Sequence, residues 1–302
     1  MTNKILASVL CSGALLLTAC GGGSSDSTNN QTKNDSKEKL DYNKSETIDI
    51  INEPVVNLSN QSENLLLNIA ILADGAYARA TAIDSKLPCI SGTATVNTDN
   101  SVTLNNCKLM ADNTGTTISV SGNIQSNTAK SGTSTKSELT LTNMNIDTAD
   151  ESISINGKLK YTYTIISDNL TQSLFESNQA TYKFIDKTNN NSIYQYTLNN
   201  YALTSNFNAS TGNIEDIAKG QLSGEIGGKV FSVNFNSNFK FSTESDFYAL
   251  KPNAAKVEIV DLYNQKNTIS ITQTISGQAL VSAYANAKLV QGYPKTVDWN
   301  EL

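Results

Sequence analysis

From residue 91 to about residue 285, the chain alternates apolar and polar positions in short segments separated by Asn, Asp, Gly and Ser. Apolar residues at every second position place one side of an extended chain in a core, and the polar breaks are typical of turns. This pattern predicts antiparallel β-structure over most of the chain.

A short motif recurs three times in this region: an apolar residue, Thr, Leu, any residue, Asn, and two apolar residues separated by one position. The copies are residues 102–109, 139–146 and 196–203. A glycine between alternating residues follows each copy, at Gly122, Gly157 and Gly220, and Gly277 stands in a similar context. We expect the asparagine to mark a bulge or turn, and the glycine to permit a bend or a close approach of the partner strand. The motif therefore predicts a run of similar hairpins.

Longer strands are predicted at residues 152–167, 180–186 and 229–243. Aromatic residues share a face in several of them, as Tyr161 does with Tyr163 and Tyr194 with Tyr196. Such residues pack across neighbouring strands in many sheets. An aromatic groove for a carbohydrate or a peptide is the alternative.

One helix is predicted over residues 60–82. Asn60 and Glu63 have the spacing of a capping box. Leu65, Ile69, Leu72 and Ala76 fall on one face, which further apolar residues widen. A helix of this kind is expected to be buried in a core. A membrane-surface helix is the alternative, but the basic face that it needs is absent.

These elements predict a mainly β fold with a single domain at residues 48–302. We expect a large antiparallel meander, formed as a curved sheet, a half-barrel or a two-sheet sandwich, with the one N-terminal helix packed on it. The end of the chain, residues 288–302, is expected to be an edge strand or a loose tail.

The first nineteen residues, 1–19, have the three parts of a secretory signal peptide. Lys4 provides the charged start, an apolar run follows from Ile5 to Leu17, and small residues precede Cys20. The apolar run is too short to span a bilayer. Residues 20–47 are rich in Ser, Asn, Asp, Lys and Thr, which predicts a disordered linker.

The residues Leu17, Thr18, Ala19 and Cys20 resemble the lipobox of bacterial lipoproteins. The resemblance implies that Cys20 becomes the mature N-terminus and carries a diacylglyceryl group and a further acyl chain such as palmitate. In that family, an aspartate after the cysteine favours the inner membrane. Gly21 stands there instead, which implies the outer membrane of a Gram-negative bacterium, with the periplasmic or surface face left open. An ordinary signal peptide cut near Ala19 is the alternative.

Composition narrows the possible partners. The whole chain has a formal net charge of −6, and removing residues 1–19, with Lys4, makes it −7. Arg79 is the only arginine, and histidine is absent. The chain therefore lacks the basic footprint of a nucleic-acid-binding protein, the usual histidine-based catalytic pairs and histidine-ligated zinc. We expect no nucleic-acid partner, no cofactor and no metal.

Cys89 and Cys107 remain as an even pair once Cys11 leaves with the signal peptide and Cys20 carries lipid. An exported protein meets an oxidising compartment, which predicts one disulfide between them. The loop of about 19 residues that it closes suggests a stabilisation on the order of 3 kcal/mol. A redox pair is the alternative, but neither cysteine lies in a Cys-x-x-Cys context.

Three acidic groups could supply oxygen ligands to calcium. They are Asp99 with Asn97 and Asn100; Asp147 with Asp150 and Glu151; and Glu244 with Asp246. None has the spacing of a calcium-binding loop. All three fall where hairpin turns are expected, and Asp and Asn favour turns by themselves.

The sequence predicts a non-catalytic outer-membrane lipoprotein, anchored to the membrane by its lipid and acting as a structural or binding component of the envelope or cell surface. A protein, a glycan or a lipid is its possible ligand. One alternative is a periplasm-facing carrier or assembly accessory for lipids or lipoproteins. Another is a carboxylate-based hydrolase of envelope glycans, which would need two carboxylates converging in a cleft.

Overall fold

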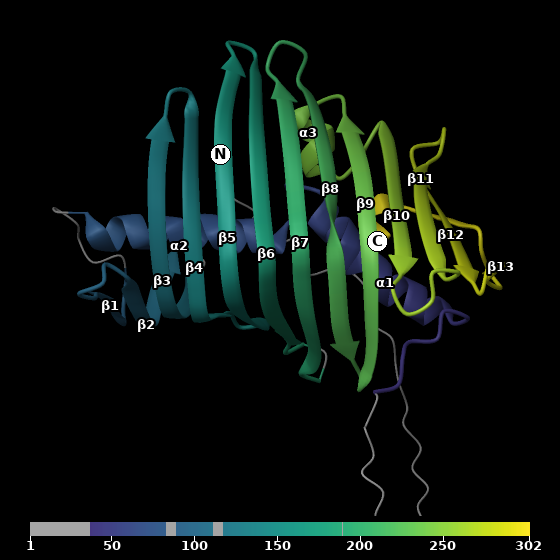
Figure 1. Ribbon diagram of the computed structural model, residues 1–302, viewed down its shortest axis with the longest axis horizontal. Coiled ribbons are helices and arrows are strands. Elements are labelled where there is room, and N and C mark those ends of the chain that lie inside the picture. The colour runs from purple at the N-terminus through teal and green to yellow at the C-terminus, as the bar shows by residue number, and fades with distance from the viewer. Residues whose placement is uncertain (1–36, 83–88, 111–116, 189) are drawn as a thin grey trace, which may run out of the picture.

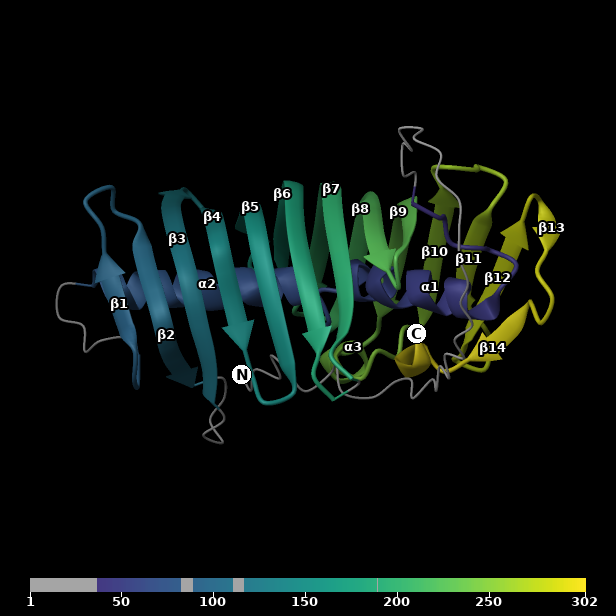
Figure 2. The ribbon, with the colours of Figure 1, turned by 90° about the horizontal axis from the view of Figure 1, so that it is seen from below.

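The fold is one antiparallel sheet that curves around two helices. The computed structural model describes residues 37–82, 89–110, 117–188 and 190–302. Within these residues the sheet has 14 strands, which follow one another in chain order from β1 to β13, while β14 pairs with β12. The predicted antiparallel meander is confirmed, and it forms one open, curved sheet rather than a two-sheet sandwich (Figures 1 and 2).

Most of the strands are long. Three of them, β5, β6 and β7, have 17 residues each, which gives a length of roughly 55 Å at about 3.3 Å per residue. The strands are β1 Thr93–Val96, β2 Val102–Met110, β3 Thr117–Ser131, β4 Ser134–Asp147, β5 Glu151–Ser167, β6 Leu170–Asp186, β7 Ser192–Asn208, β8 Asn213–Ile226, β9 Lys229–Phe241, β10 Ala254–Asp261, β11 Thr268–Gln273, β12 Ala279–Ala285, β13 Lys288–Leu289 and β14 Lys295–Val297.

The repeated asparagines form β-bulges, as the motif predicted. Asn106, Asn143 and Asn200 have φ angles of 46°, 48° and 48°, and the strand register shifts beside each of them. Asparagine tolerates this left-handed conformation better than β-branched residues do. The backbone N–H of Asn106 donates to Ser121 Oγ at 2.9 Å, and that of Asn143 donates to Asn156 Oδ1 at 2.7 Å. Bulges increase the local twist, which helps the sheet to curve.

The glycine that follows a motif allows neighbouring strands to approach closely. Gly122 has a φ angle of 126°, and a Cβ atom there would lie 2.5 Å from Met144 Cα in the next bulged strand. The prediction for Gly277 is wrong, because Gly277 lies in the turn between β11 and β12 rather than in a strand.

Two long helices, α1 (Ser45–Ser59) and α2 (Leu65–Thr81), cross the strands on one side of the sheet, which we call the inner face. They follow one another across the sheet, and two perpendicular views show the strands running past them (Figures 1 and 2). Two short elements, α3 (Glu244–Tyr248) and the 3₁₀ helix η1 (Trp299–Glu301), also pack on inner-face residues of β9. Among the described residues, no helix is long and apolar enough to cross a membrane.

The predicted helix begins later than its capping box suggested. The N-cap residue is Asn64, whose Oδ1 accepts the backbone N–H of Leu67 at 3.0 Å. Asn60 Oδ1 instead accepts from the backbone N–H and the hydroxyl of Ser62, which closes a turn before the helix. The buried side of the helix is also rotated from the predicted one, since Leu65 and Leu72 are only partly buried.

Helix α1 was not predicted. Pro54 lies inside it, and a helix-interior proline removes one backbone hydrogen bond. Burial offsets this cost, because Ile48, Ile51 and Val55 are fully buried against the sheet.

The described end of the expected linker also packs on the domain. Lys39 bridges to Val230 of β9, and Tyr42 is buried. The folded domain therefore begins before residue 48.

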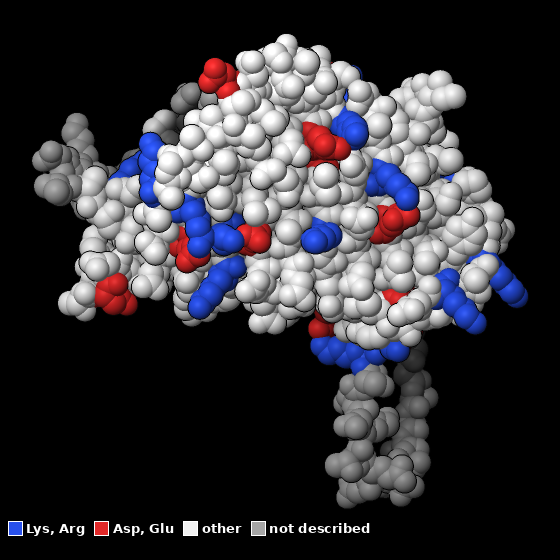
Figure 3. Space-filling model, turned by 45° about the horizontal axis from the view of Figure 1, so that its top comes forward, with Lys and Arg blue, Asp and Glu red and all other residues white. Residues whose placement is uncertain are grey.

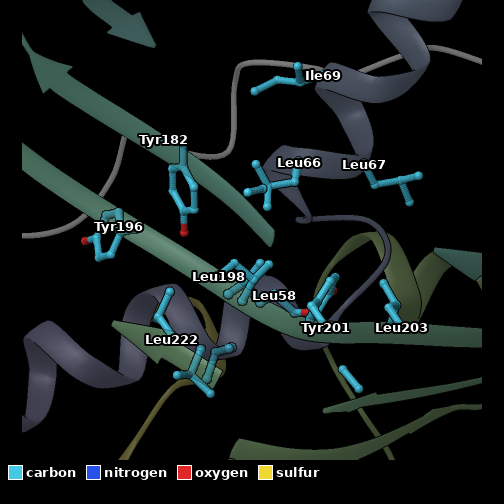
Figure 4. Packing of buried hydrophobic residues seen from close by; sticks show 14 of the residues in the cluster. Leu58, Leu66, Leu67, Ile69, Tyr182, Tyr196, Leu198, Tyr201, Leu203 and Leu222 are labelled. Carbon is cyan, nitrogen blue, oxygen red and sulfur yellow. The ribbon is translucent and has the colours of Figure 1, made fainter. Parts of the chain in front are cut away.

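The core lies between the helices and the inner face. Leu66, Leu67 and Ile69 of α2 are buried, and Leu66 lies on the side of Tyr182 in β6 and Leu198 in β7 (Figure 4). Each fully buried side chain of this size contributes about 1.5–3 kcal/mol.

Most of the paired aromatic residues pack in this core. The rings of Tyr182 and Tyr196 stack with their centroids 5.0 Å apart. Tyr163, near the end of β5, is 36% exposed, so part of the predicted aromatic face is open to solvent.

The end of the chain adds to the sheet edge. Strand β13 is the last strand in the sheet order, and β14 pairs with β12. The edge-strand alternative for residues 288–302 is therefore correct for these two short segments.

Candidate functional site

The residues that predict lipidation lie outside the described residues. These are Leu17, Thr18 and Ala19 of the lipobox, and Cys20 itself. The attachment of the protein to a membrane therefore stays a prediction from the sequence.

The predicted disulfide is present, with the sulfur atoms of Cys89 and Cys107 2.05 Å apart. It ties the chain just before the edge strand β1 to β2. Two backbone hydrogen bonds between residues 90–91 and Lys108, both 2.8 Å long, continue this pairing. The disulfide therefore fixes one edge of the sheet.

Residues of the three acidic groups form hydrogen bonds within a turn, to a lysine of a neighbouring turn and at a helix cap. Asp99 Oδ1 accepts from the hydroxyl of Ser101 at 2.7 Å, and this bond, with that from the Ser101 backbone, lowers the pKa of Asp99. Asp147 accepts from Lys187 Nζ at 2.8 Å. Asp246 and Thr243 cap α3, so this group begins a short helix rather than a hairpin turn. No group of three potential metal ligands occurs within the described ranges.

A polar cluster joins the two helices to the sheet where the chain turns from α1 into α2, and all of its members except the partly exposed Gln61 are buried. We call it the helix-corner cluster, and its members are Asn60, Gln61, Asn64, Tyr201 and Asp216. The hydroxyl of Tyr201 donates to the carbonyl of Leu58, and Asn64 Nδ2 donates to Tyr201 Oη at 2.6 Å. The carbonyl of Leu58 and the N-terminal turn of α2 are thus held by one side chain of β7 (Figure 4).

Asp216 of β8 is the charged member of the cluster. Its Oδ2 accepts the backbone N–H of Gln61 at 2.8 Å, and its side chain is fully buried. Burial raises the pKa of Asp216 to about 6, although hydrogen bonds from Gln61 and Ser205 act in the opposite direction. The carboxyl group therefore changes its charge near pH 6.

The buried carboxyl groups of Asp216 and Glu151 do not converge. Strand pairing aligns Asp216 with Ser205, Ser173 and Tyr163, which is twelve residues along β5 from Glu151. At about 3.3 Å per residue, this corresponds to roughly 40 Å. Two carboxylates that cleave a glycosidic bond lie about 5 to 9.5 Å apart, so this pair does not form such a site.

The opposite side of the sheet, the outer face, carries rows of polar side chains. One row crosses the sheet from β3 to β12, and its neighbours are aligned by the strand pairing. The row is polar at every position except Ala202, and its members are Asn127, Glu138, Lys160, Glu176, Ala202, Lys219, Asn236, Glu258, Ser270 and Ser282. Nine steps at about 4.8 Å give a width of roughly 45 Å.

Charges of both signs meet along this face. Lys160 pairs with Glu176, and Lys136 pairs with Glu138. The hydrogen bond and charge of Lys136, followed by the charges of Lys160 and Lys158, lower the pKa of Glu138. Figure 3 shows lysines gathered over the strands near β3 to β5, with acidic residues among them. Opposite charges on adjacent strands stabilise the sheet while leaving a hydrated surface.

The chain was compared with models of protein families, with curated proteins and with solved structures, and none of them matched it.

The sequence did not identify the helix-corner cluster. Asn60 was interpreted as a helix cap, and residues 201 and 216 were only part of the region predicted as antiparallel β-structure. One signal was available, because Asp216 lies among inner-face positions that are otherwise small or apolar, such as Ile214 and Ala218. A charged residue at such a position indicates a buried polar contact, but not its partner.

Proposed function

We propose that this protein is a non-catalytic outer-membrane lipoprotein that acts as a binding or structural component of the bacterial envelope. In this proposal the acylated Cys20 attaches the chain to the membrane, and the folded domain binds another macromolecule. The observation that carries the binding role is the outer face, a polar surface roughly 45 Å wide that crosses ten strands.

The difference between the two faces of the sheet supports this role. The inner face is occupied by the protein's own helices, with Ile51, Leu66 and Ala73 fully buried. The outer face presents hydroxyl, amide, ammonium and carboxylate groups, which offer both donors and acceptors of hydrogen bonds. Every described helix packs on the inner side, so the described elements leave these groups accessible to a partner.

The membrane attachment is tested with the full-length chain and a Cys20→Ser variant, each with a C-terminal epitope. We expect the natural chain in the outer-membrane fraction and the variant in the soluble fraction. A matched control is Cys11→Ser, which changes a cysteine inside the signal peptide and is expected to leave the attachment intact. Equal distribution of the natural chain and the Cys20→Ser variant would refute the lipid anchor.

Protease shaving then identifies the membrane face. Loss of the epitope from intact cells would place the domain outside and support binding at the cell surface. Loss only after permeabilisation would place it in the periplasm and restrict the proposal to an envelope partner. The periplasmic carrier of lipids would then be tested by lipid extraction of the purified protein.

A further inference from the structure

A pocket lies on the inner side of the fold, away from the outer face. It has a volume of about 390 Å³ and is lined by three segments that are far apart in the sequence, residues 249–252, 276–278 and 298–300. These segments follow α3, form the β11–β12 turn and include η1. Small-molecule sites have volumes of about 300–1,000 Å³, so this pocket has the size of a site for a small ligand.

The apolar side chains of Leu250, Pro252 and Trp299 form part of the pocket lining. Leu250, Pro252 and Trp299 are buried, and the indole ring of Trp299 packs edge-on against Phe239 with centroids 5.2 Å apart. The indole N–H donates to Gln273 Oε1. The ring contact with Phe239 and the hydrogen bond to Gln273 thus fix the position of the Trp299 side chain.

The backbone at the pocket follows the end of α3. Leu250 has a φ angle of 46°, the left-handed conformation in which many helices end, and the backbone N–H of Lys251 donates to the carbonyl of Asp246 at 2.8 Å. The end of α3 thus determines the position of this part of the pocket lining.

The rim of the pocket is polar and carries one charge of each sign. Lys251, Ser276, Asp298 and Asn300 are exposed, and Asp298 Oδ1 accepts from Gln278 Nε2 at 3.1 Å. Within the described ranges, no carboxylate forms an ion pair with Lys251. The rim therefore offers an ammonium group, two amides, a hydroxyl and a carboxylate to a ligand.

We infer that this pocket binds a neutral saccharide unit, such as a hexose or an N-acetylhexosamine. A saccharide has hydroxyl groups that both donate and accept hydrogen bonds, which matches the mixed rim, and C–H groups that can contact the apolar part of the lining. A free anion would be attracted by Lys251 but repelled by Asp298. The inference goes beyond the proposed function, which concerns the outer face, and rests on the proposed envelope location for the choice of ligand, because an envelope component meets saccharides.

The fluorescence of Trp299 can report binding at the pocket, since Trp299 is the only tryptophan of the protein. The full chain is titrated with a panel of neutral hexoses and N-acetylhexosamines, as mono- and disaccharides, and with inorganic phosphate. We expect at least one saccharide to change the tryptophan fluorescence in a saturable way. Lys251→Met and Asn300→Ala should each weaken the binding about tenfold, as the loss of a hydrogen bond from a charged or well-placed group does.

Lys266→Met is the matched control, because it removes an exposed lysine from the turn between β10 and β11, at the other end of β11 from the pocket, and should leave the affinity unchanged. Thermal unfolding of each variant verifies that it is folded. The inference is overturned if no saccharide of the panel gives a saturable change, if only phosphate does, or if the pocket variants bind as the natural chain does. The fractionation of Cys20→Ser is independent of this titration, so failure of the pocket and failure of the membrane role are distinguishable.

Discussion

At the scale of single residues, Asp216 shows how one buried carboxyl group organises the inner face. It accepts the backbone N–H of Gln61, which belongs to the turn between the two helices. Neighbouring apolar inner-face residues cannot form this bond. This hydrogen bond holds the turn between α1 and α2. It has a cost when the carboxyl group is ionised, because the negative charge is then buried away from water.

This arrangement predicts a pH dependence of stability. The pKa of Asp216 is about 6 in the folded protein and about 4 in an unfolded chain, so the folded protein binds more protons between these pH values. The contribution of Asp216 to the free energy of unfolding is therefore most favourable below about pH 4 and is lost as the pH rises through about 6. The loss is on the order of 3 kcal/mol.

Urea unfolding of the natural chain and of Asp216→Asn across this pH range measures the effect. We expect the variant to lack this decrease in stability. Glu244→Gln, an equivalent change at an exposed position, should retain it. The assignment would be contradicted if, across this pH range, the stability of the natural chain decreased no more than that of Asp216→Asn.

At the scale of elements, the bulge motif couples three strands. The bulge at Asn143 brings the backbone of β4 close to Gly122 of β3, and Gly122 also pairs with Leu104 of β2. Gly122→Ala should therefore lower the free energy of unfolding by several kcal/mol, since the new Cβ atom would lie 2.5 Å from Met144 Cα.

Gly75→Ala is the matched control for this substitution. Gly75 lies in α2, and its Cβ atom would have no neighbour within 4 Å. Alanine favours the helix, so this variant should be more stable by about 0.5–1 kcal/mol. Urea unfolding of both variants tests the pair, and similar effects of the two substitutions would argue against strand crowding at Gly122.

We expect removal of the disulfide to have a local effect at the edge of the sheet. Changing Cys89 and Cys107 together to Ser removes the covalent link between the start of β1 and β2, with an expected loss on the order of 3 kcal/mol. Hydrogen exchange of residues 93–96 should become faster, whereas exchange in β6 should change little at the level of local opening. Unchanged exchange in β1 would show that the backbone pairing alone holds this edge.

The elements also show what sequence reasoning can predict. The strands and the bulges follow from alternation and from the preference of Asn and Gly for particular backbone conformations, which are local properties. Helix α1 was missed because Pro54 and the polar Asn52 interrupt its apolar pattern. The helix-corner cluster was missed because Gln61 and Asp216 are 155 positions apart, and no local pattern records their contact.

At the scale of the whole molecule, the sheet has one core, and it depends on the two helices that cross it. The pocket segments were likewise not predictable, since the strand order brings them together only in the complete fold. Contacts between elements that are far apart in the sequence therefore form both the core and the candidate ligand site. This arrangement predicts that the domain unfolds as one unit, because a sheet without its helices would expose its apolar inner face.

Leu66→Ala tests this cooperativity. Leu66 is fully buried under the sheet, so its truncation should lower the free energy of unfolding by about 2–5 kcal/mol. The matched control, Ile71→Ala, changes a residue of the same helix that is 49% exposed and should have a much smaller effect. Helix content is followed by circular dichroism, and the far end of the core by the fluorescence of Trp299, which packs on β9. If the domain is one cooperative unit, Leu66→Ala shifts both transitions to the same lower urea concentration. Two separate transitions, with that of Trp299 unchanged, would show instead that the sheet beneath α2 and the sheet beneath η1 unfold independently.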